Sequence, residues 1–308
     1  MRAFLFPGQG SQAVGMGSAL AGASETARRV FEEVDEALGQ NLFRLMREGP
    51  DDELKLTENA QPAIMANSIA VLRAWGIRLP DLASFVAGHS LGEYSALCAA
   101  ESFDLATTAK LLKLRGQAMQ AAVPVGQGAM AALLGADLAL AQKIAEAAAQ
   151  GEICTVANDN DPTQVVISGH KGAIDRAVEL AKDMGAKRAV LLPVSAPFHC
   201  PLMQPAAEAM QDALGYVVLE APSVPLYANV TAQPETDPDT IRNQLVEQVT
   251  GMVRWRESVA NMASAGVDEF VELGGKVLAG MVKRIAPDAK VTSVVTLEDI
   301  DALAKEIA

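Results

Sequence analysis

The sequence is short of cysteine and of positive charge. Its three cysteines are odd in number and form no Cys-x-x-Cys pair, which argues against a disulfide framework and a cysteine-based zinc site. The 25 lysines and arginines are outnumbered by 38 acidic residues, giving a formal charge of −13, and no basic cluster offsets this excess. We therefore expect no nucleic acid and no anionic membrane among the partners.

The sequence also lacks the segments that direct a protein to or through a membrane. No run of 18 apolar residues occurs, so no membrane-spanning helix is predicted. The apolar run at the N-terminus ends at Pro7 and is too short for a signal peptide. Together with the cysteine content, this predicts a soluble, cytoplasmic protein, and a monomer is the default expectation.

Apolar residues, in contrast, are abundant: they make up 50% of the chain, against 20% charged residues. This composition is typical of a folded chain with a sizeable core. Short apolar runs alternate with amphipathic stretches at 25–38, 60–75 and 105–122, which predicts an α/β fold with a mostly parallel sheet. The strands expected to be buried and parallel are residues 3–6, 84–87, 188–194, 224–230, 269–273 and 291–295.

One segment follows a different order. Within residues 126–195 the pattern predicts strand, helix, strand, strand, helix, strand, at 129–134, 138–150, 154–158, 164–168, 171–184 and 188–192. This βαββαβ order predicts a ferredoxin-like subdomain, inserted into a large α/β domain formed by residues 1–125 and 196–308. Proline and glycine in "VPVGQGAM" and "PVSAPFHCP" suit the two crossings between the domains.

The stretch "VAGHSLGEYSAL" places Ser90 between Gly88 and Gly92, after a predicted strand and before a predicted helix. Gly-x-Ser-x-Gly in this context is the pattern of a nucleophile elbow, where strand, turn and helix lie too close together for side chains. The helix start directs backbone N–H groups at a reacting carbonyl, and the amide of Leu91 is the expected oxyanion donor. The alternative is a tight turn in which a small serine merely fits.

A serine nucleophile needs a base, and the chain has three histidines. His89 leaves the strand in a different direction from Ser90, so we expect it to pack against or orient the elbow. His170 is expected in an exposed loop of the small subdomain. His199 follows a predicted strand and can lie at its carboxyl end, where open α/β sheets place their ligands. By elimination His199 is the predicted general base and acid, the alternative being a loop histidine without a role.

Arg115 lies on the apolar side of its predicted helix. The residues three and four positions away on either side are all apolar: Leu111, Leu112, Ala118 and Met119. A cation buried there needs an anion, because burying it unpaired is costly. The anion is either an internal acidic side chain or a substrate carboxylate, which arginine holds with two parallel hydrogen bonds.

The N-terminal stretch "FLFPGQGSQA" nearly matches a dinucleotide-binding fingerprint, through Gly8, Gly10 and Ala13. That fingerprint also needs a second strand ending in an acid about 20 residues further on. Residues 25–38 instead predict an amphipathic helix, so an oxidoreductase is disfavoured. A glycine-rich turn at a strand end can still bring Gln9 to an active site, where its amide could donate to an oxyanion.

Seven sequence motifs extend over nearly the whole chain, from residue 3 to about 297: "FPGQGSQ", "GHSLGEYSAL", "LRGQAMQ", "GAMAALLG", "NDNDPTQVVISG", "VSAPFHCPLM" and "LVEQVTGMVRW". In combination and in this order they resemble the bacterial malonyl-CoA:acyl carrier protein transacylases. The same motifs mark the acyltransferase domains of polyketide synthases. The resemblance implies an α/β-hydrolase-like large domain that carries a ferredoxin-like insertion, in agreement with the expected strand order.

The resemblance also implies roles for individual residues. Ser90 matches the family's nucleophile and His199 its histidine. Arg115 matches the arginine that holds the malonyl carboxylate. The backbone amides of Leu91 and Gln9 match the oxyanion donors.

Three further positions follow from the same resemblance. Gln248 matches a glutamine whose main-chain carbonyl orients the histidine, so that a Ser–His dyad needs no carboxylate. Asn158 matches an asparagine near the active site. Phe198, directly before His199, resembles the Phe-His ending typical of malonyl-selective members, where methylmalonyl-selective ones usually carry Ser-His.

The implied reaction is ping-pong transfer of a malonyl group from the coenzyme A thioester to the phosphopantetheine thiol of holo-acyl carrier protein. It would supply fatty acid biosynthesis and need no metal or redox cofactor. Lys187, Arg188 and Lys283 are candidates for a basic carrier-docking surface between the domains.

Three alternatives stay open: service to a polyketide synthase, a serine hydrolase or thioesterase on the same elbow, and an inert carrier-binding protein. A typical α/β-hydrolase has its histidine near the C-terminus, whereas 109 residues follow His199. Hydrolases of neutral esters also have no use for Arg115. An intact Ser90, His199 and Arg115 argue against an inert protein.

Overall fold

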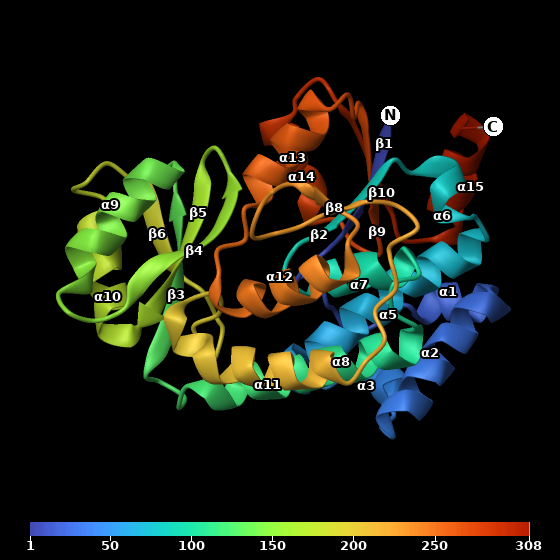
Figure 1. Ribbon diagram of the computed structural model, residues 1–308, viewed down its shortest axis with the longest axis horizontal. Helices are drawn as coiled ribbons and strands as arrows, with labels where there is room; N and C mark the ends of the chain where they lie inside the picture. Colours follow the sequence, from blue (N-terminus) through green and yellow to red (C-terminus); the bar gives the residue numbers. More distant parts are fainter. Residues whose placement is uncertain (308) are drawn as a thin grey trace.

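Two β-sheets organise the fold, and each lies at the centre of one subdomain (Figure 1). The computed structural model describes residues 1–307. The strands of the larger sheet are β1 (Arg2–Phe6), β2 (Phe85–Gly88), β7 (Leu226–Tyr227), β8 (Pro234–Glu235), β9 (Glu269–Leu273) and β10 (Lys290–Val294). Their order across the sheet is β10-β9-β1-β2-β7-β8.

The larger sheet is mostly parallel, as the sequence predicts. Strands β10, β9, β1, β2 and β7 pair in parallel, and only β8 runs antiparallel, to β7. The strand expected at residues 224–230 is much shorter than predicted, because only Leu226 and Tyr227 pair with β2. The α/β fold class is therefore confirmed.

Helices cover both faces of this sheet, because successive strand residues point to opposite sides. Phe4 and Phe6 of β1 face one core, and Ala3 and Leu5 face the other. The helices that contribute to the first core are α1 (Ser18–Ala23), α2 (Glu25–Leu38), α3 (Leu42–Glu48), α4 (Asp51–Lys55), α5 (Thr57–Trp75), α6 (Leu79–Leu82), α7 (Leu91–Ala99), α8 (Leu105–Ala122), α11 (Gln204–Gly215), α12 (Pro238–Thr250) and α15 (Leu297–Ile307). The helices that contribute to the second core are α13 (Trp255–Ser264) and α14 (Leu278–Ile285).

The smaller subdomain lies to the left in Figure 1 and has its own apolar core. Its elements are β3 (Gly128–Leu134), α9 (Leu138–Ala149), β4 (Cys154–Asp161), β5 (Gln164–His170), α10 (Lys171–Ala181) and β6 (Arg188–Leu191). The strands form an antiparallel sheet in the order β4-β5-β3-β6, which confirms the βαββαβ, ferredoxin-like arrangement. The boundaries at residues 125/126 and 195/196 stay predictions.

One predicted strand of the large sheet was wrong. Residues 188–194 were expected as a buried parallel strand, but β6 ends at Leu191 and pairs antiparallel with β3 at the edge of the small sheet. Two of its four residues are exposed and the other two are partly buried. An edge strand has a neighbour on one side alone, which explains why an apolar run here does not lead to full burial.

The end of β4 ties the small subdomain to the large one. The backbone N–H of Asp159 donates to the carbonyl of Val253, at 2.9 Å. The buried carboxylates of Asp159 and Asp161 pair with Arg256 and Arg284, at 2.8 and 2.7 Å. Because each acid is buried and charged, its arginine partner offsets a large desolvation cost. These interactions fix the position of one wall of the cavity described below.

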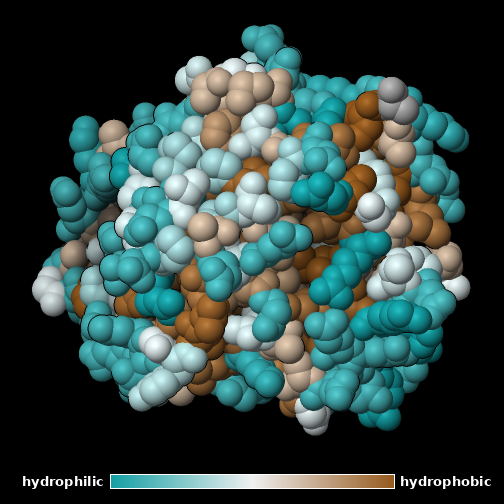
Figure 2. Space-filling view, turned by 45° about the vertical axis from the view of Figure 1, so that its right-hand side comes forward, coloured by the Kyte–Doolittle hydropathy of each residue, from teal (hydrophilic) through white to brown (hydrophobic). Residues whose placement is uncertain are grey.

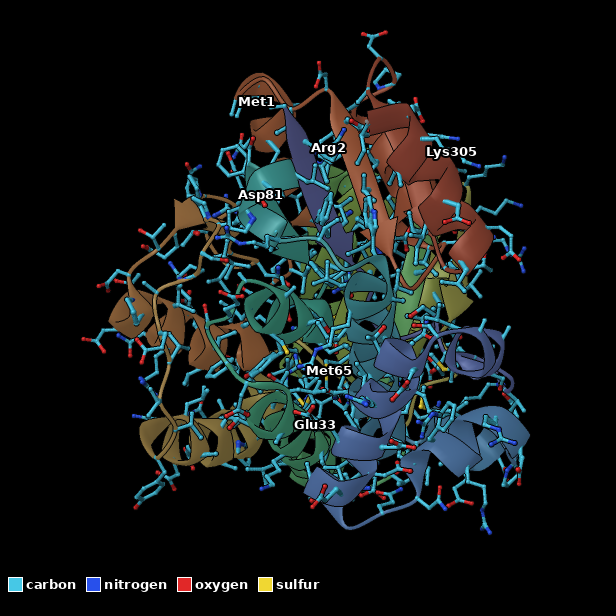
Figure 3. The ribbon with its side chains drawn as sticks, turned by 90° about the vertical axis from the view of Figure 1, so that its right-hand side faces the viewer. Met1, Arg2, Glu33, Met65, Asp81 and Lys305 are labelled. Atoms are coloured by element: carbon cyan, nitrogen blue, oxygen red, sulfur yellow. The ribbon has the colours of Figure 1, made fainter. Side chains whose placement is uncertain are left out.

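The large subdomain has a densely packed interior and a polar exterior. Figure 3 shows Met65 of α5 at the centre, fully buried, while Met1 and Lys305 lie at the periphery. Figure 2 shows hydrophilic side chains over most of the visible face, with apolar side chains gathered in the furrows between them. None of the helices within residues 1–307 is long and apolar enough to cross a membrane.

Candidate active site

Ser90 occupies a strained turn between β2 and α7. Its backbone angles are φ 55° and ψ −111°, in a region that residues with a side chain rarely adopt. A Cβ atom added at Gly88 would lie 1.8 Å from the carbonyl oxygen of Gly92, and one at Gly92 would lie 2.2 Å from that of Phe6. Both glycines are therefore required by close backbone approach, which is the geometry that the nucleophile elbow predicts.

Asn229 holds this turn in place, and nothing in the sequence pattern pointed to it. Its side-chain oxygen accepts a hydrogen bond from the backbone N–H of Ser90, at 2.8 Å. Its side-chain nitrogen donates to the carbonyl of Gly88, at 2.7 Å. Asn229 is buried, so both bonds form away from water and stabilise the strained backbone of Ser90.

His199 lies against the serine. Its Nε2 is 2.8 Å from Ser90 Oγ, and its Nδ1 is 2.8 Å from the main-chain carbonyl oxygen of Gln248. A carbonyl can only accept, so Nδ1 carries the proton and Nε2 presents a lone pair to the serine hydroxyl. The backbone carbonyl thus takes the orienting position that a carboxylate holds in a Ser-His-Asp triad.

The path of the chain to His199 differs from the expected one. We expected His199 at the carboxyl end of a strand, but it lies in the loop after β6, with a positive φ of 57°. The loop returns the chain from the small subdomain and places the imidazole beside the elbow. The dyad is therefore formed by segments 109 residues apart in the sequence.

The environment keeps His199 neutral. Burial, with the neighbouring positive charge of Arg115, lowers the pKa of His199 to about 3. The imidazole is therefore uncharged at neutral pH, which is the form that can accept the serine proton.

Arg115 is buried next to the dyad, as its apolar helix face predicts. Its guanidinium donates to Ser90 Oγ at 3.1 Å, to Gln248 Oε1 at 2.8 Å and to Gln61 Oε1 at 2.7 Å. None of these partners is an acid, so within residues 1–307 the guanidinium has no direct carboxylate partner. Its buried Nε donor has no hydrogen-bond partner in the same part of the chain. Arg115 can therefore receive an anion.

A cavity of about 370 Å³ opens over these groups, between the two subdomains. Met130 and Leu192 line it from the side of the small subdomain. The cavity brings together most of the predicted site residues: Gln9, Ser90, Leu91, Arg115, Asn158, Phe198 and His199. Gln248 is fully buried beneath the cavity surface and contacts the site through His199 and Arg115.

The two predicted oxyanion donors lie at the cavity. Leu91 is the first residue of α7, and the first N–H groups of a helix have no partner within it. Gln9 follows β1, and its side chain accepts from Thr57 Oγ1 at 3.0 Å. Thr57 in turn accepts from Gln61 Nε2 at 2.9 Å, so a hydrogen-bonded chain connects Gln9 to Arg115. Gln61 was not predicted, although a glutamine in a strongly apolar helix is a usable signal.

The other two histidines have structural contacts. His89 Nε2 lies 2.8 Å from Asn160 Oδ1, so His89 joins the elbow to the end of β4 and does not face the serine hydroxyl, as expected. The expectation for His170 was wrong. It is the half-buried last residue of β5, and its Nδ1 accepts from the backbone N–H of Ile153 at 2.9 Å.

A larger surface cavity, of about 700 Å³, lies at the other end of α7 and is lined by Cys98 and Arg73. Burial raises the pKa of Cys98 to about 11, which makes its thiol a poor nucleophile. Within residues 1–307, no group of three His, Cys, Asp or Glu side chains could hold a metal ion.

Comparison with known proteins gives consistent results. Residues 3–294 match the family described as "Acyl transferase domain". The chain is 46% identical over 284 residues to the malonyl CoA-acyl carrier protein transacylase of Escherichia coli, covering 92% of each chain. The crystal structure of acyl-carrier-protein-S-malonyltransferase from Bartonella henselae superposes with a TM-score of 0.97 at 54% identity, covering 99% of this chain and 98% of that one.

A second similar structure contains a partner. It is described as a type II PKS acyl-carrier protein in complex with its malonyl-transacylase, and it matches with a TM-score of 0.96 at 40% identity. The match covers 99% of both chains.

Proposed function

The chain belongs to the acyl transferase family, and from this premise we propose that it transfers a malonyl group from malonyl-CoA to the phosphopantetheine thiol of acyl carrier protein. The transfer passes through an ester on Ser90 and supplies malonyl-carrier protein for fatty acid biosynthesis. The observation that carries the proposal is the position of Arg115, whose guanidinium lies 3.1 Å from the oxygen of a serine already paired with histidine.

The first half-reaction loads the serine. His199 Nε2 takes the proton of Ser90 Oγ while Oγ attacks the thioester carbonyl carbon. The backbone N–H groups of Leu91 and Gln9 stabilise the oxyanion that forms. The carbon–sulfur bond then breaks, and the coenzyme A sulfur leaves with the proton from His199. The products are malonyl-Ser90 and free coenzyme A.

The second half-reaction repeats these steps with the carrier protein. His199 takes the proton of the phosphopantetheine thiol, and the sulfur attacks the ester carbonyl of malonyl-Ser90. The same two amides stabilise the oxyanion. The carbon–oxygen bond breaks and Ser90 regains its proton from His199, so the enzyme returns to its starting state.

Arg115 selects the acyl group. A malonyl ester on Ser90 carries a free carboxylate a few bonds from the ester carbonyl, within the reach of a guanidinium that already contacts Oγ. Arg115 lines the cavity over Ser90, so its guanidinium can donate to that carboxylate. In a site shielded from water such a charge-assisted pair is strong, and an uncharged acyl group leaves the arginine without its anion. Asn158 and Phe198 line the same cavity and contact the bound acyl chain in this proposal.

We also propose a partner protein, the lack of a cofactor requirement and a location. Holo-acyl carrier protein approaches the cavity between the subdomains. Lys187, Arg188 and Lys283 are exposed and are our candidates for its docking surface. Because every step uses protein groups alone, the reaction as proposed needs no cofactor. We propose a cytoplasmic location, in keeping with the three free cysteines, and a monomer stays a prediction.

The proposal is tested by following the radiolabelled malonyl group of malonyl-CoA in three parallel reactions. One contains holo-carrier protein, one contains apo-carrier protein without the phosphopantetheine thiol, and one contains buffer alone. We expect transfer of label to carrier protein only where the holo form is present, and slow release as free malonate in the other two reactions.

Each alternative predicts a different outcome. A hydrolase or thioesterase would release malonate at the same rate in all three reactions. An inert carrier-binding protein would leave malonyl-CoA intact in all three. Either result would refute the transferase proposal.

A further inference from the structure

Beneath the active site lies a buried carboxyl group that the steps above do not use. Glu93 is on the first turn of α7, three residues after the nucleophile, and is 1% exposed. Removing a carboxyl group from water costs free energy unless hydrogen bonds or an opposite charge compensate for it. The hydrogen bonds of Glu93 show which groups do so.

Glu93 contacts the active site through the side chain of Gln248. Gln248 Nε2 donates to a carboxyl oxygen of Glu93 and, at 3.0 Å, to the carbonyl of Ser90. Gln248 Oε1 accepts from Arg115 at 2.8 Å. The main-chain oxygen of the same residue accepts from His199 Nδ1. One glutamine thus contacts the nucleophile's backbone, the general base and the malonyl-binding arginine.

The direction of the Gln248 amide matters for this arrangement. With its oxygen toward Arg115 the amide accepts from the guanidinium, whereas the flipped amide would place an NH₂ group against another donor. An ionised carboxylate can only accept hydrogen bonds, so it requires the NH₂ group on its own side. A protonated carboxyl group can donate as well and no longer imposes that direction.

We propose that Glu93 is a positioning residue for acyl transfer: its carboxylate fixes the Gln248 amide, and through it Arg115 and the backbone support of His199. This inference rests on the proposed function, because it assigns Arg115 to the malonyl carboxylate. Glu93 also supplies a negative charge one hydrogen-bonded side chain away from Arg115, which lacks a direct acidic partner within residues 1–307.

The pKa of Glu93 is consistent with the positioning role that its hydrogen bonds indicate. Burial raises the pKa of Glu93 to about 7, against the opposing effects of Gln248, Asn229 and the charge of Arg115. The other ionisable groups around it change little near neutral pH. His199 is neutral well above its pKa of about 3, and burial raises the pKa of Tyr94, the neighbour on the same helix. Burial also lowers the pKa of His89, which is bonded to Asn160, and the pKa of Arg115, whose usual value lies far above neutrality. The pKa of Glu93, in contrast, is about 7.

The inference is tested by the pH dependence of single-turnover acylation. Malonyl-pantetheine serves as the donor, because it lacks the phosphates of coenzyme A that titrate near pH 6. The rate of ester formation is measured by rapid quench and mass spectrometry from pH 5.5 to pH 8.5. Wild type is compared with Glu93→Gln, Glu93→Asp and a matched control, Glu101→Gln, at an exposed acid just beyond the same helix.

We expect the wild-type rate to rise about tenfold between pH 6 and pH 8, since the ionised fraction of a group with a pKa of about 7 rises by that factor. The rise persists in Glu101→Gln. In Glu93→Gln the rate is low and independent of pH, because an amide can accept or donate and imposes no direction on Gln248. Glu93→Asp keeps the rise but has a lower maximum, since the shorter side chain holds its carboxylate further from Gln248.

A merely structural role would lower the rate at all pH values without changing the profile. A pH-dependent rise in Glu93→Gln equal to that of wild type overturns the inference. If Glu93→Gln does not fold, a flat profile in Glu93→Asp overturns it instead.

Failure of the proposed function gives a separate result. If wild type is not malonylated at any pH, the transferase proposal fails. The same comparison with a neutral fluorophosphonate, which labels Ser90 without using Arg115, then decides the inference on Glu93: loss of the pH-dependent rise in Glu93→Gln supports it, and an unchanged rise overturns it.

Discussion

Replacing Arg115 with alanine separates recognition of the malonyl carboxylate from the chemistry of the serine. In the present structure the guanidinium donates to Ser90, Gln61 and Gln248, so its removal leaves two buried amide oxygens without a donor. Some loss of activity is therefore expected with every acyl donor. The informative quantity is the ratio of kcat/KM for malonyl-CoA to that for acetyl-CoA, because both donors suffer the general loss and only malonyl loses its counterion.

The size of the change follows from the hydrogen bonds that alanine cannot form with the malonyl carboxylate. A hydrogen bond to a charged group contributes about 1.5–3 kcal/mol, and a guanidinium offers a carboxylate two of them in a buried site. The loss specific to malonyl is therefore about 3–6 kcal/mol. Since about 1.4 kcal/mol corresponds to a tenfold change, the malonyl-to-acetyl ratio falls about 100- to 10,000-fold.

The assay measures initial rates of transfer to holo-carrier protein over a range of donor concentrations. Lys110→Ala is the matched control, because it removes a cation from an exposed position of the same helix. We expect this control to leave the ratio unchanged. An unchanged ratio in Arg115→Ala as well would refute the assignment of the carboxylate to this arginine.

The remaining predictions concern the stability of the site. Gly88→Ala places a Cβ atom 1.8 Å from a backbone carbonyl oxygen, and we expect it to destabilise the fold by more than about 4 kcal/mol in chemical unfolding. The control Gly22→Ala is tolerated, because a Cβ atom there would meet nothing within 4 Å. Asn229→Ala removes an acceptor from the N–H of Ser90 and costs about 1–3 kcal/mol together with a slower acylation, and an unchanged unfolding midpoint would contradict this. Folding raises the pKa of Glu93 from 4.5 to about 7, so between these pH values the folded state binds a proton that the unfolded state has released. Wild type therefore loses about 3 kcal/mol of stability as the pH rises through this range. Glu93→Gln escapes this loss, so its stability relative to wild type should be greater at pH 8 than at pH 4.5, and equal differences at the two pH values would count against it.

The sequence predicts those parts of the fold whose signals are local. Residues 25–38 match α2, because an amphipathic run follows Ser24, whose side chain accepts from the N–H of Ala27. Residues 269–273 match β9, a strand whose residues are buried except for the partly exposed Glu269. The prediction for residues 188–194 was wrong because position in a sheet depends on which strands pair, and apolar content alone does not carry that information.

The same distinction holds at the active site. The elbow around Ser90 and the apolar surroundings of Arg115 are local patterns, and both predict the observed geometry. Gln248 came from resemblance to a family and not from its own surroundings. Asn229 and Glu93 carry no local signal, since Asn229 contacts a serine 139 residues away and Glu93 a glutamine 155 residues away. Such pairs exist only once the chain has folded.

Acyl transfer by this protein requires a malonyl ester on Ser90, and peptide mass spectrometry after brief incubation with malonyl-CoA measures that ester directly. Wild type and Ser90→Ala are treated in parallel, and the wild-type adduct is then divided between holo-carrier protein and buffer. We expect a malonyl group on the wild-type peptide that contains Ser90 and none on that of the variant. We also expect the malonyl group to be lost much faster to the carrier protein than to buffer. An adduct at another residue, or equal rates of loss in the two halves, would contradict it.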